Sequence, residues 1–182
     1  MFVIHPKDRT TAMLSLLYEG QEARVINGYC STKEMGHLLH HISSQERIIM
    51  LGHGKANGLF YREDDTKDVF DKLIVFHPHA FSLRKHGSNL VAIWCHADQF
   101  ARKEGLHGLF SGMIISELGE ALLYDVETTQ EELDRENVKL AQRIRSLLDE
   151  RIPLSEIPAR MLALDDVHSP LTTFNYRNFC YL

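Results

Sequence analysis

Short apolar runs alternate with longer segments of mixed polarity along the chain. Two runs, residues 48–51 and 90–94, are almost continuously apolar. Such runs are typical of central strands that are covered on both faces. Shorter runs predict further strands at residues 2–5, 23–27, 59–61, 73–76 and 110–116.

Helical periodicity fills the intervals between these runs. Ser31-Thr-Lys-Glu34 is a capping box, and the apolar residues after it recur at helical spacing. A second box, Thr128-Thr-Gln-Glu131, predicts a long helix to about Arg151 with an inward stripe of Leu133, Val138, Leu140, Ile144, Leu147 and Leu148. Residues 98–104 and 155–164 predict shorter helices.

This alternation indicates an α/β fold, with a mostly parallel central sheet and helices on both faces. The 182 residues are enough for one core, so we expect a single domain over residues 1–182. From about residue 127 the helices form a C-terminal extension, and the aromatic tail from Phe174 packs back on the body.

A reactive side chain follows each of the two central strands. The first run leads into Gly52-His53-Gly54, and the second leads through Trp94 into Cys95. Chemistry collects at the carboxyl ends of parallel strands, where a histidine and a thiol can form a base–nucleophile pair. The flanking glycines allow a sharp turn, and the backbone N–H groups of Gly54 and Cys95 are candidate donors to an oxyanion.

Charge and cysteine usage limit the classes of function. The net charge of −5 and the absence of a Lys/Arg-rich run argue against a nucleic-acid binder. No apolar stretch is long enough to span a membrane, and the N-terminus has no secretory-signal pattern. Three cysteines without CxxC spacing suit a reducing compartment, so we expect a cytoplasmic protein.

The sequence offers little support for a cofactor or a metal. The glycines form neither GxGxxG nor a P-loop, so no nucleotide cofactor is expected. Candidate metal ligands are His77, His79, His96 and Asp98, but their spacings match neither HExxH nor paired CxxC. A metal site therefore ranks well below the thiol–imidazole pair.

At these residues the chain resembles the caspase-like cysteine peptidases, which include caspases, legumain, gingipains, separase and CHAT domains. The resemblance covers roughly residues 1–125, from an apolar strand ending in His-Gly to an apolar strand ending in cysteine. The run Gly-Leu-His-Gly-Leu-Phe-Ser-Gly at 105–112 is also similar to the glycine-rich segment after the CHAT cysteine. The resemblance implies a His53/Cys95 dyad with Gly54 aiding the oxyanion, acting on a peptide or protein substrate.

Two hypotheses follow, an enzyme and a binding module. The first is a cysteine peptidase or related hydrolase, for which Asn57, Asp98 and Glu117 are candidate substrate-binding residues. Asp98 and Glu117 would form acidic lips for a basic side chain. The second is a catalytically silent module that uses the same cleft to hold a peptide or small ligand. His96-Ala-Asp98 after the thiol, in place of a small or glycine-containing turn, favours the second; the sequence leaves the oligomeric state open.

Overall fold

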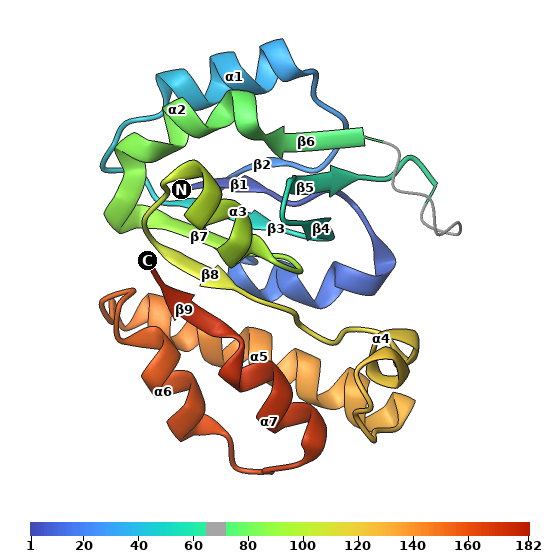
Figure 1. Cartoon of the computed structure of the whole chain (residues 1–182). Helices are drawn as coiled ribbons and strands as arrows, with labels where there is room; N and C mark the ends of the chain where they lie inside the picture. Colours follow the sequence, from blue (N-terminus) through green and yellow to red (C-terminus); the bar gives the residue numbers. More distant parts are fainter. Residues whose placement is uncertain (65–71) are drawn as a thin grey trace.

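A twisted sheet of mostly parallel strands forms the centre of the computed structural model, which describes residues 1–64 and 72–182 (Figure 1). In spatial order its described strands are β2 (Arg24–Ile26), β1 (Phe2–Ile4), β3 (Ile48–Leu51), β7 (Leu90–Ile93), β8 (Leu109–Ser111) and β9 (Phe179–Tyr181). All neighbouring pairs are parallel except β8 and β9. The predicted α/β class with a mostly parallel sheet is confirmed.

A second, antiparallel sheet lies beyond the carboxyl end of β3. It consists of β4 (Gly54–Lys55), β5 (Gly58–Tyr61) and β6 (Lys72–Phe76). The Asn57-Gly58 pair is a tight-turn signal in the sequence, and it lies at the turn between β4 and β5, since Lys55 pairs with Gly58. The sequence also predicts a charged loop from Glu63 to Asp68, which lies partly outside the described residues.

Helices cover both faces of the main sheet, and two buried clusters follow from the alternation of strand side chains. Phe2, Ile4 and Met50 face one cluster, whereas Val3, Ile49 and Leu51 face the other. The first face is covered by α1 (Thr32–His41), η2 (His77–His79), α2 (Ala80–Leu83), η3 (Arg84–Asn89) and α3 (Ala97–Glu104). The second is covered by η1 (Arg9–Leu17), α5 (Gln130–Asp149), α6 (Ile157–Leu164) and α7 (Pro170–Arg177).

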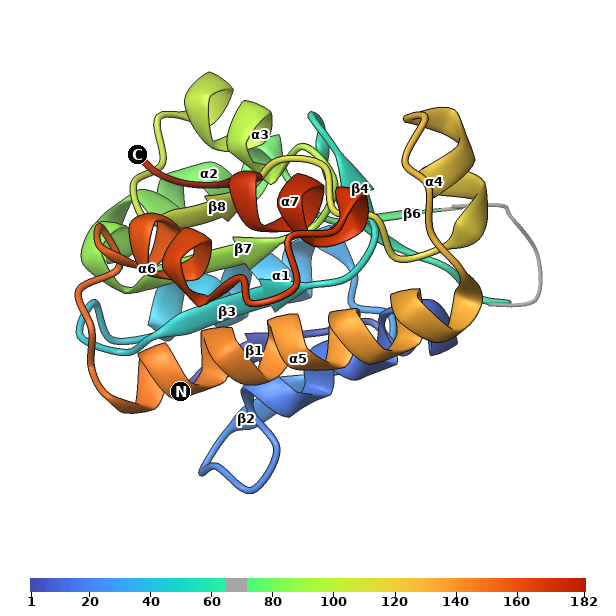
Figure 2. The same ribbon diagram turned by 90° about the horizontal axis from the view of Figure 1, so that it is seen from below.

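The segment from about residue 127 is an integral layer of this fold. Figure 2 shows α5 running along the sheet, and its Leu140, Ile144 and Leu147 pack into the same cluster as Val3 and Ile49. The chain then returns through α7 and adds β9 to the edge of the sheet. The expectation that the aromatic tail packs back is confirmed, because Phe179 is buried.

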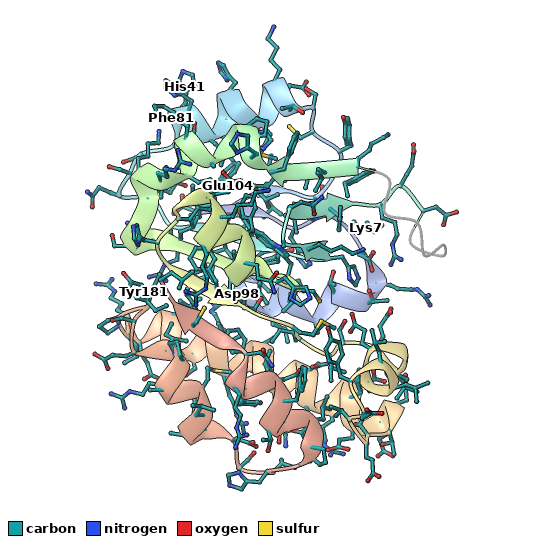
Figure 3. The ribbon with its side chains drawn as sticks, in the orientation of Figure 1. Lys7, His41, Phe81, Asp98, Glu104 and Tyr181 are labelled. Atoms are coloured by element: carbon teal, nitrogen blue, oxygen red, sulfur yellow. The ribbon has the colours of Figure 1, made fainter. Side chains whose placement is uncertain are left out.

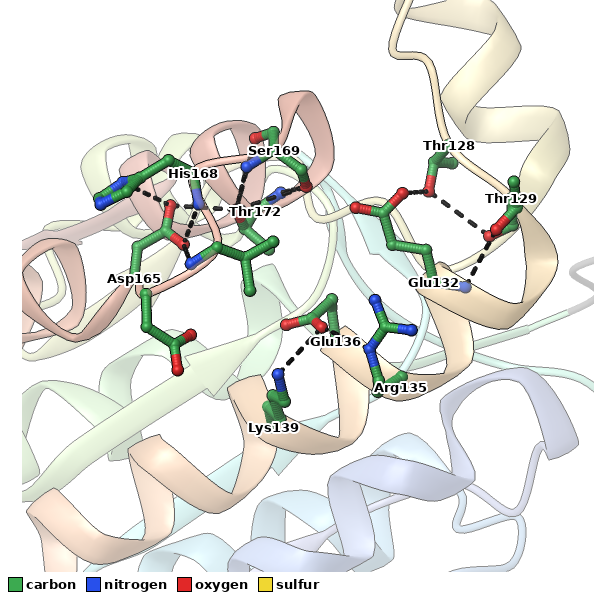
Figure 4. A network of polar contacts seen from close by, with 12 residues as sticks. Thr128, Thr129, Glu132, Arg135, Glu136, Lys139, Asp165, His168, Ser169 and Thr172 are labelled. Carbon is green, nitrogen blue, oxygen red and sulfur yellow. Dashed lines mark hydrogen bonds and ion pairs between the residues drawn. The ribbon is translucent and has the colours of Figure 1, made fainter.

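Two details of the predicted long helix are wrong. The N-cap is Thr129 rather than Thr128, since the Thr129 side chain accepts a hydrogen bond from Glu132 N at 3.2 Å (Figure 4). Val138 is 37% exposed and does not belong to the inward stripe. Helical spacing fixes which residues share a face, but it does not fix how wide the covered face is. By contrast, the Ser31–Glu34 capping box is present as predicted.

The remaining differences between the predicted and the observed elements lie in short strands and helices. The strand expected at 110–116 ends at Ser111, and α4 (Leu118–Leu123) follows after an irregular segment. Neither α4 nor α7 has a strong periodic pattern, and helices of this length depend on tertiary contacts. Within residues 1–64 and 72–182, no helix combines the length and apolar character needed to cross a membrane.

We expect Ile144→Ala to lower the free energy of unfolding by about 2–5 kcal/mol, because it leaves a cavity between α5 and the sheet. Val138→Ala on the same helix is the matched control and should cost less than about 1 kcal/mol. Urea denaturation of both variants measures the difference. Equal small losses would mean that α5 is not part of the cooperative core.

Candidate functional site

His53 and Cys95 come from neighbouring parallel strands. β3 pairs with β7, with Leu51 opposite Ile93, and Gly52 N donates to Ile93 O at 3.1 Å. Each strand ends shortly before its reactive residue, so both side chains emerge at the same edge of the sheet. They line one cavity of about 380 Å³. The structure thus places both residues at one cavity, at the edge of the sheet that the sequence indicates.

Two polar residues at the start of η1 orient the His53 imidazole. Its Nε2 lies 2.6 Å from Thr10 Oγ1 and 3.6 Å from Asp8 Oδ1. The Thr10 hydroxyl donates its proton to Asp8 Oδ1 at 2.7 Å, so its oxygen is the acceptor for His53. This network assigns the proton of the neutral imidazole to Nε2.

Asp8 is the charged end of this network. Its Oδ2 contacts Nε and Nη2 of Arg62 at 2.7 and 2.5 Å, and both side chains are buried. Burial alone would raise the pKa of Asp8, but hydrogen bonds from His53 and Thr10 outweigh it and hold the pKa well below its ordinary value. Asp8 is therefore a carboxylate at neutral pH and holds the hydrogen-bonded Thr10 and His53 side chains in one orientation.

Gly52 and Gly54, on either side of His53, must be glycine for two different structural reasons. Gly52 has φ +137°, a conformation that side-chain-bearing residues rarely adopt. Gly54 lies against the Trp94 ring, and a Cβ there would be 2.2 Å from Trp94 Cδ1. Since Phe60 N donates to His53 O, Gly54 and Leu59 form a non-hydrogen-bonded pair of the hairpin. The Gly54 N–H thus points away from β5, as an oxyanion donor must.

Cys95 is a protonated thiol in this structure. Burial raises its pKa to about 12, and the nearby charge of Glu120 adds to the effect. The thiol donates to Ile114 O, with Sγ and O 3.8 Å apart. A resting thiolate is therefore absent at neutral pH, and attack by Cys95 needs a base that takes its proton during the reaction.

The residue after the thiol adopts a conformation that favours glycine. His96 has φ +67° and ψ +30°, and its N–H donates to Gly112 O at 3.1 Å. A left-handed conformation costs a residue with a side chain roughly 1–2 kcal/mol. The sharp turn that the sequence seemed to lack at His96 is therefore present, and the surrounding contacts hold it. Such strain is concentrated at functional sites.

A buried amide pair fixes the backbone that follows β8. Asn175 Oδ1 accepts from Ile115 N at 2.8 Å, and its Nδ2 donates to Ile115 O at 3.0 Å. Asn137 Nδ2 also donates to Ile115 O, at 3.2 Å, and its own Oδ1 accepts from Asn175. Two C-terminal helices thereby clamp the backbone beside Ile114, the acceptor of the Cys95 thiol.

The candidate substrate-binding residues do not all reach the cavity. Glu117 lines it, together with Glu120 at the start of α4. Asn57 is exposed at the hairpin turn and is not part of the lining. Asp98 lies on α3 (Figure 3), and its charge acts on Cys180 of β9 rather than on the cavity. The acidic lip expected from the sequence is thus formed by Glu117 without Asp98.

The histidines considered as metal ligands have separate partners. His77 Nδ1 contacts Glu104 at 2.8 Å, and His79 accepts from Phe76 N while its other nitrogen faces Thr32 O. His96 contacts Gln99. In the part of the chain that the structure describes, no three histidine, cysteine or acidic side chains gather with metal-binding geometry.

Sequence reasoning missed Asp8, Thr10, Arg62, Asn137 and Asn175, which orient the site. Asp8 and Thr10 lie more than forty residues from His53 in the chain, and no motif links them. The Asp8 capping position before η1 was the one local signal. A larger cavity of about 800 Å³ lies between β2 and α1, but neither His53 nor Cys95 lines it.

Comparisons with protein-family models, with curated proteins and with solved structures each find no significant match.

We expect Asp8→Asn to lower the free energy of unfolding by about 3–5 kcal/mol at neutral pH, because it removes the carboxylate that is ion-paired with the buried Arg62. The folded-state pKa of Asp8 is depressed, so its contribution is present above the ordinary value of 3.8 and is lost as the pH falls below it. Urea denaturation of both proteins from neutral pH to below 3.8 should show the difference shrinking. A difference independent of pH would exclude the carboxylate as its source.

We expect Gly54→Ala to destabilise the protein by roughly 1–3 kcal/mol or more, because the new methyl group overlaps the Trp94 ring and Gly58 O. Gly28→Ala is the matched control, since a Cβ at Gly28 meets no atom within 4 Å. Thermal unfolding of the two variants measures the contrast. Comparable effects would show that the hairpin does not pack closely against Trp94.

Proposed function

We propose that the protein is a cysteine-dependent hydrolase of caspase-like fold that cleaves an amide or ester bond in a peptide or protein. Cys95 is the nucleophile and His53 the general acid–base, with the backbone N–H groups of Gly54 and Cys95 as oxyanion donors. The observation that carries the proposal is the shared cavity of His53 and Cys95, in which the imidazole is oriented by Thr10 and Asp8. A nucleophile, a base and a group that orients the base are the parts of such a site.

The chemistry follows from the protonation states. The His53 imidazole takes the thiol proton as Cys95 Sγ attacks the carbonyl carbon, and the carbonyl π electrons move to its oxygen. The oxyanion then collapses, the bond to the leaving group breaks, and His53 returns the proton to that group. Water next attacks the thioester while His53 takes its proton. The C–S bond breaks, and the proton restores the Cys95 thiol.

Because the pKa of Cys95 is raised, His53 must remove the thiol proton during the reaction. With a pKa of about 12, almost none of the thiol is ionised at neutral pH. Proton transfer therefore accompanies attack instead of preceding it. Asp8 assists by stabilising the imidazolium that forms, and the Thr10 hydroxyl transmits that interaction through its hydrogen bonds.

A catalytically silent binding module is the second candidate function. The thiol of Cys95 is neutral and bonded to Ile114 O, which also suits a structural cysteine in a peptide-binding cleft. The module would use the same lining residues to hold its ligand. In either case we propose a cytoplasmic location, because all three cysteines are free thiols.

A set of peptidyl acyloxymethyl ketones with apolar, basic or acidic side chains tests the enzyme hypothesis near neutral pH. We expect at least one of these probes to label Cys95 faster than Cys30 or Cys180, as measured by mass spectrometry of the modified peptides. His53→Gln should slow this labelling by roughly 10²-fold or more, because proton transfer is lost.

His96→Asn is the matched control, because His96 lines the same cavity but lies outside the Thr10–Asp8 network. It should leave the labelling rate close to that of wild type. If Cys95 reacts no faster than the other two cysteines, or if His53→Gln has no effect, the hydrolase proposal is rejected in favour of the binding module.

A further inference from the structure

One wall of the candidate cavity is apolar and stays partly open to solvent. Phe60 of β5, Met113 after β8, and Leu123 and Tyr124 of the α4 region all line the cavity. Leu123 is 76% exposed although it contributes to this wall. A large apolar side chain at the rim of a cavity loses its contact with water when a ligand covers it.

Contacts other than the burial of Leu123 hold α4 in place. The Glu120 carboxylate accepts from Ser116 N at 2.7 Å, from Ser116 Oγ at 3.1 Å and from Glu117 N at 3.2 Å. Ala121 anchors the inner side of the helix in a small cluster with Ile115, Leu133 and Leu171. The helix is thus held by polar contacts and by Ala121, which leaves Leu123 available at the cavity.

The charges around the cavity are of both signs. Arg62 is paired with Asp8, whereas Glu120 accepts hydrogen bonds from uncharged donors and keeps its negative charge. Lys55 is exposed and Glu117 is half-buried, and their charges are of opposite sign. An ion pair formed by a ligand with either would be screened by solvent and contribute little.

We propose that the cavity binds an apolar side chain of the substrate, on the residue that supplies the scissile carbonyl, and that this side chain covers Leu123. The proposal rests on the proposed function of Cys95 and His53. A volume of about 380 Å³ lies near the lower end of the range for ligand pockets and leaves room for a side chain such as leucine or phenylalanine. Leu123 and Tyr124 line the same cavity as Cys95. The occupant that fits this arrangement is therefore a side chain of the substrate that Cys95 attacks.

Two matched acyloxymethyl ketone probes test this inference, one with norleucine and one with lysine beside the ketone. The two side chains have similar length and differ in charge. We expect the norleucine probe to label Cys95 about tenfold faster or more than the lysine probe, as is typical for apolar discrimination in a pocket. Faster labelling by lysine would overturn the inference and assign recognition to Glu117, while the proposed function would stand.

Neighbouring leucines of α4 provide the control variants. Leu122 is 81% exposed and Leu123 is 76% exposed, but of these two residues only Leu123 lines the cavity. Leu123→Ser should slow labelling by the norleucine probe about tenfold, and Leu122→Ser should change it less than about twofold. Equal effects of the two substitutions, or no effect of Leu123→Ser, would overturn the inference. Failure of every probe to label Cys95 above the level of Cys30 and Cys180 would instead reject the proposed function, and the inference with it.

Discussion

The parallel pairing of β3 with β7 is the constraint on which the candidate site depends. Because Leu51 lies opposite Ile93, the chain leaves both strands at the same edge and at the same height. The hydrogen bond from Gly52 N to Ile93 O extends this alignment one residue beyond the strands. A shift of one residue would turn a set of buried side chains to the opposite face of the sheet. The hydrophobic core therefore specifies the relative position of His53 and Cys95.

A second level of organisation links the C-terminal helices to the site. Asn137 of α5 and Asn175 of α7 bind both backbone groups of Ile115, and the preceding carbonyl accepts the Cys95 thiol. Buried amides of this kind are costly unless every group is paired, so a satisfied pair fixes one geometry. The C-terminal third of the chain thereby serves as more than a cover for the sheet, because it positions the backbone that accepts the Cys95 thiol.

The strands and their reactive ends could be predicted because they depend on local patterns. Apolar runs specify buried strands, and the side chains that follow them must lie at the strand ends. The partners of His53 could not be predicted in this way. Asp8 and Thr10 meet His53, and Arg62 meets Asp8, only after the sheet and the hairpin have formed. The turn at His96 illustrates the same limit. Its residue type argues against a glycine-like conformation, yet tertiary contacts impose φ +67° there.

The burial of Cys95 connects specificity with reactivity. A thiol with a pKa of about 12 is nearly inert toward oxidants and nonspecific electrophiles at neutral pH, because the thiolate is the reactive form. Under the proposed function, attack depends on a ligand that brings a carbonyl to Cys95 beside His53. A side chain that fills the cavity and covers Leu123 would hold that carbonyl in place, so binding at the apolar wall would be coupled to the chemical step. The hydrogen bonds that link His53 to Thr10 and Thr10 to Asp8 support this proposal over the binding module, because a general base must be held in one orientation.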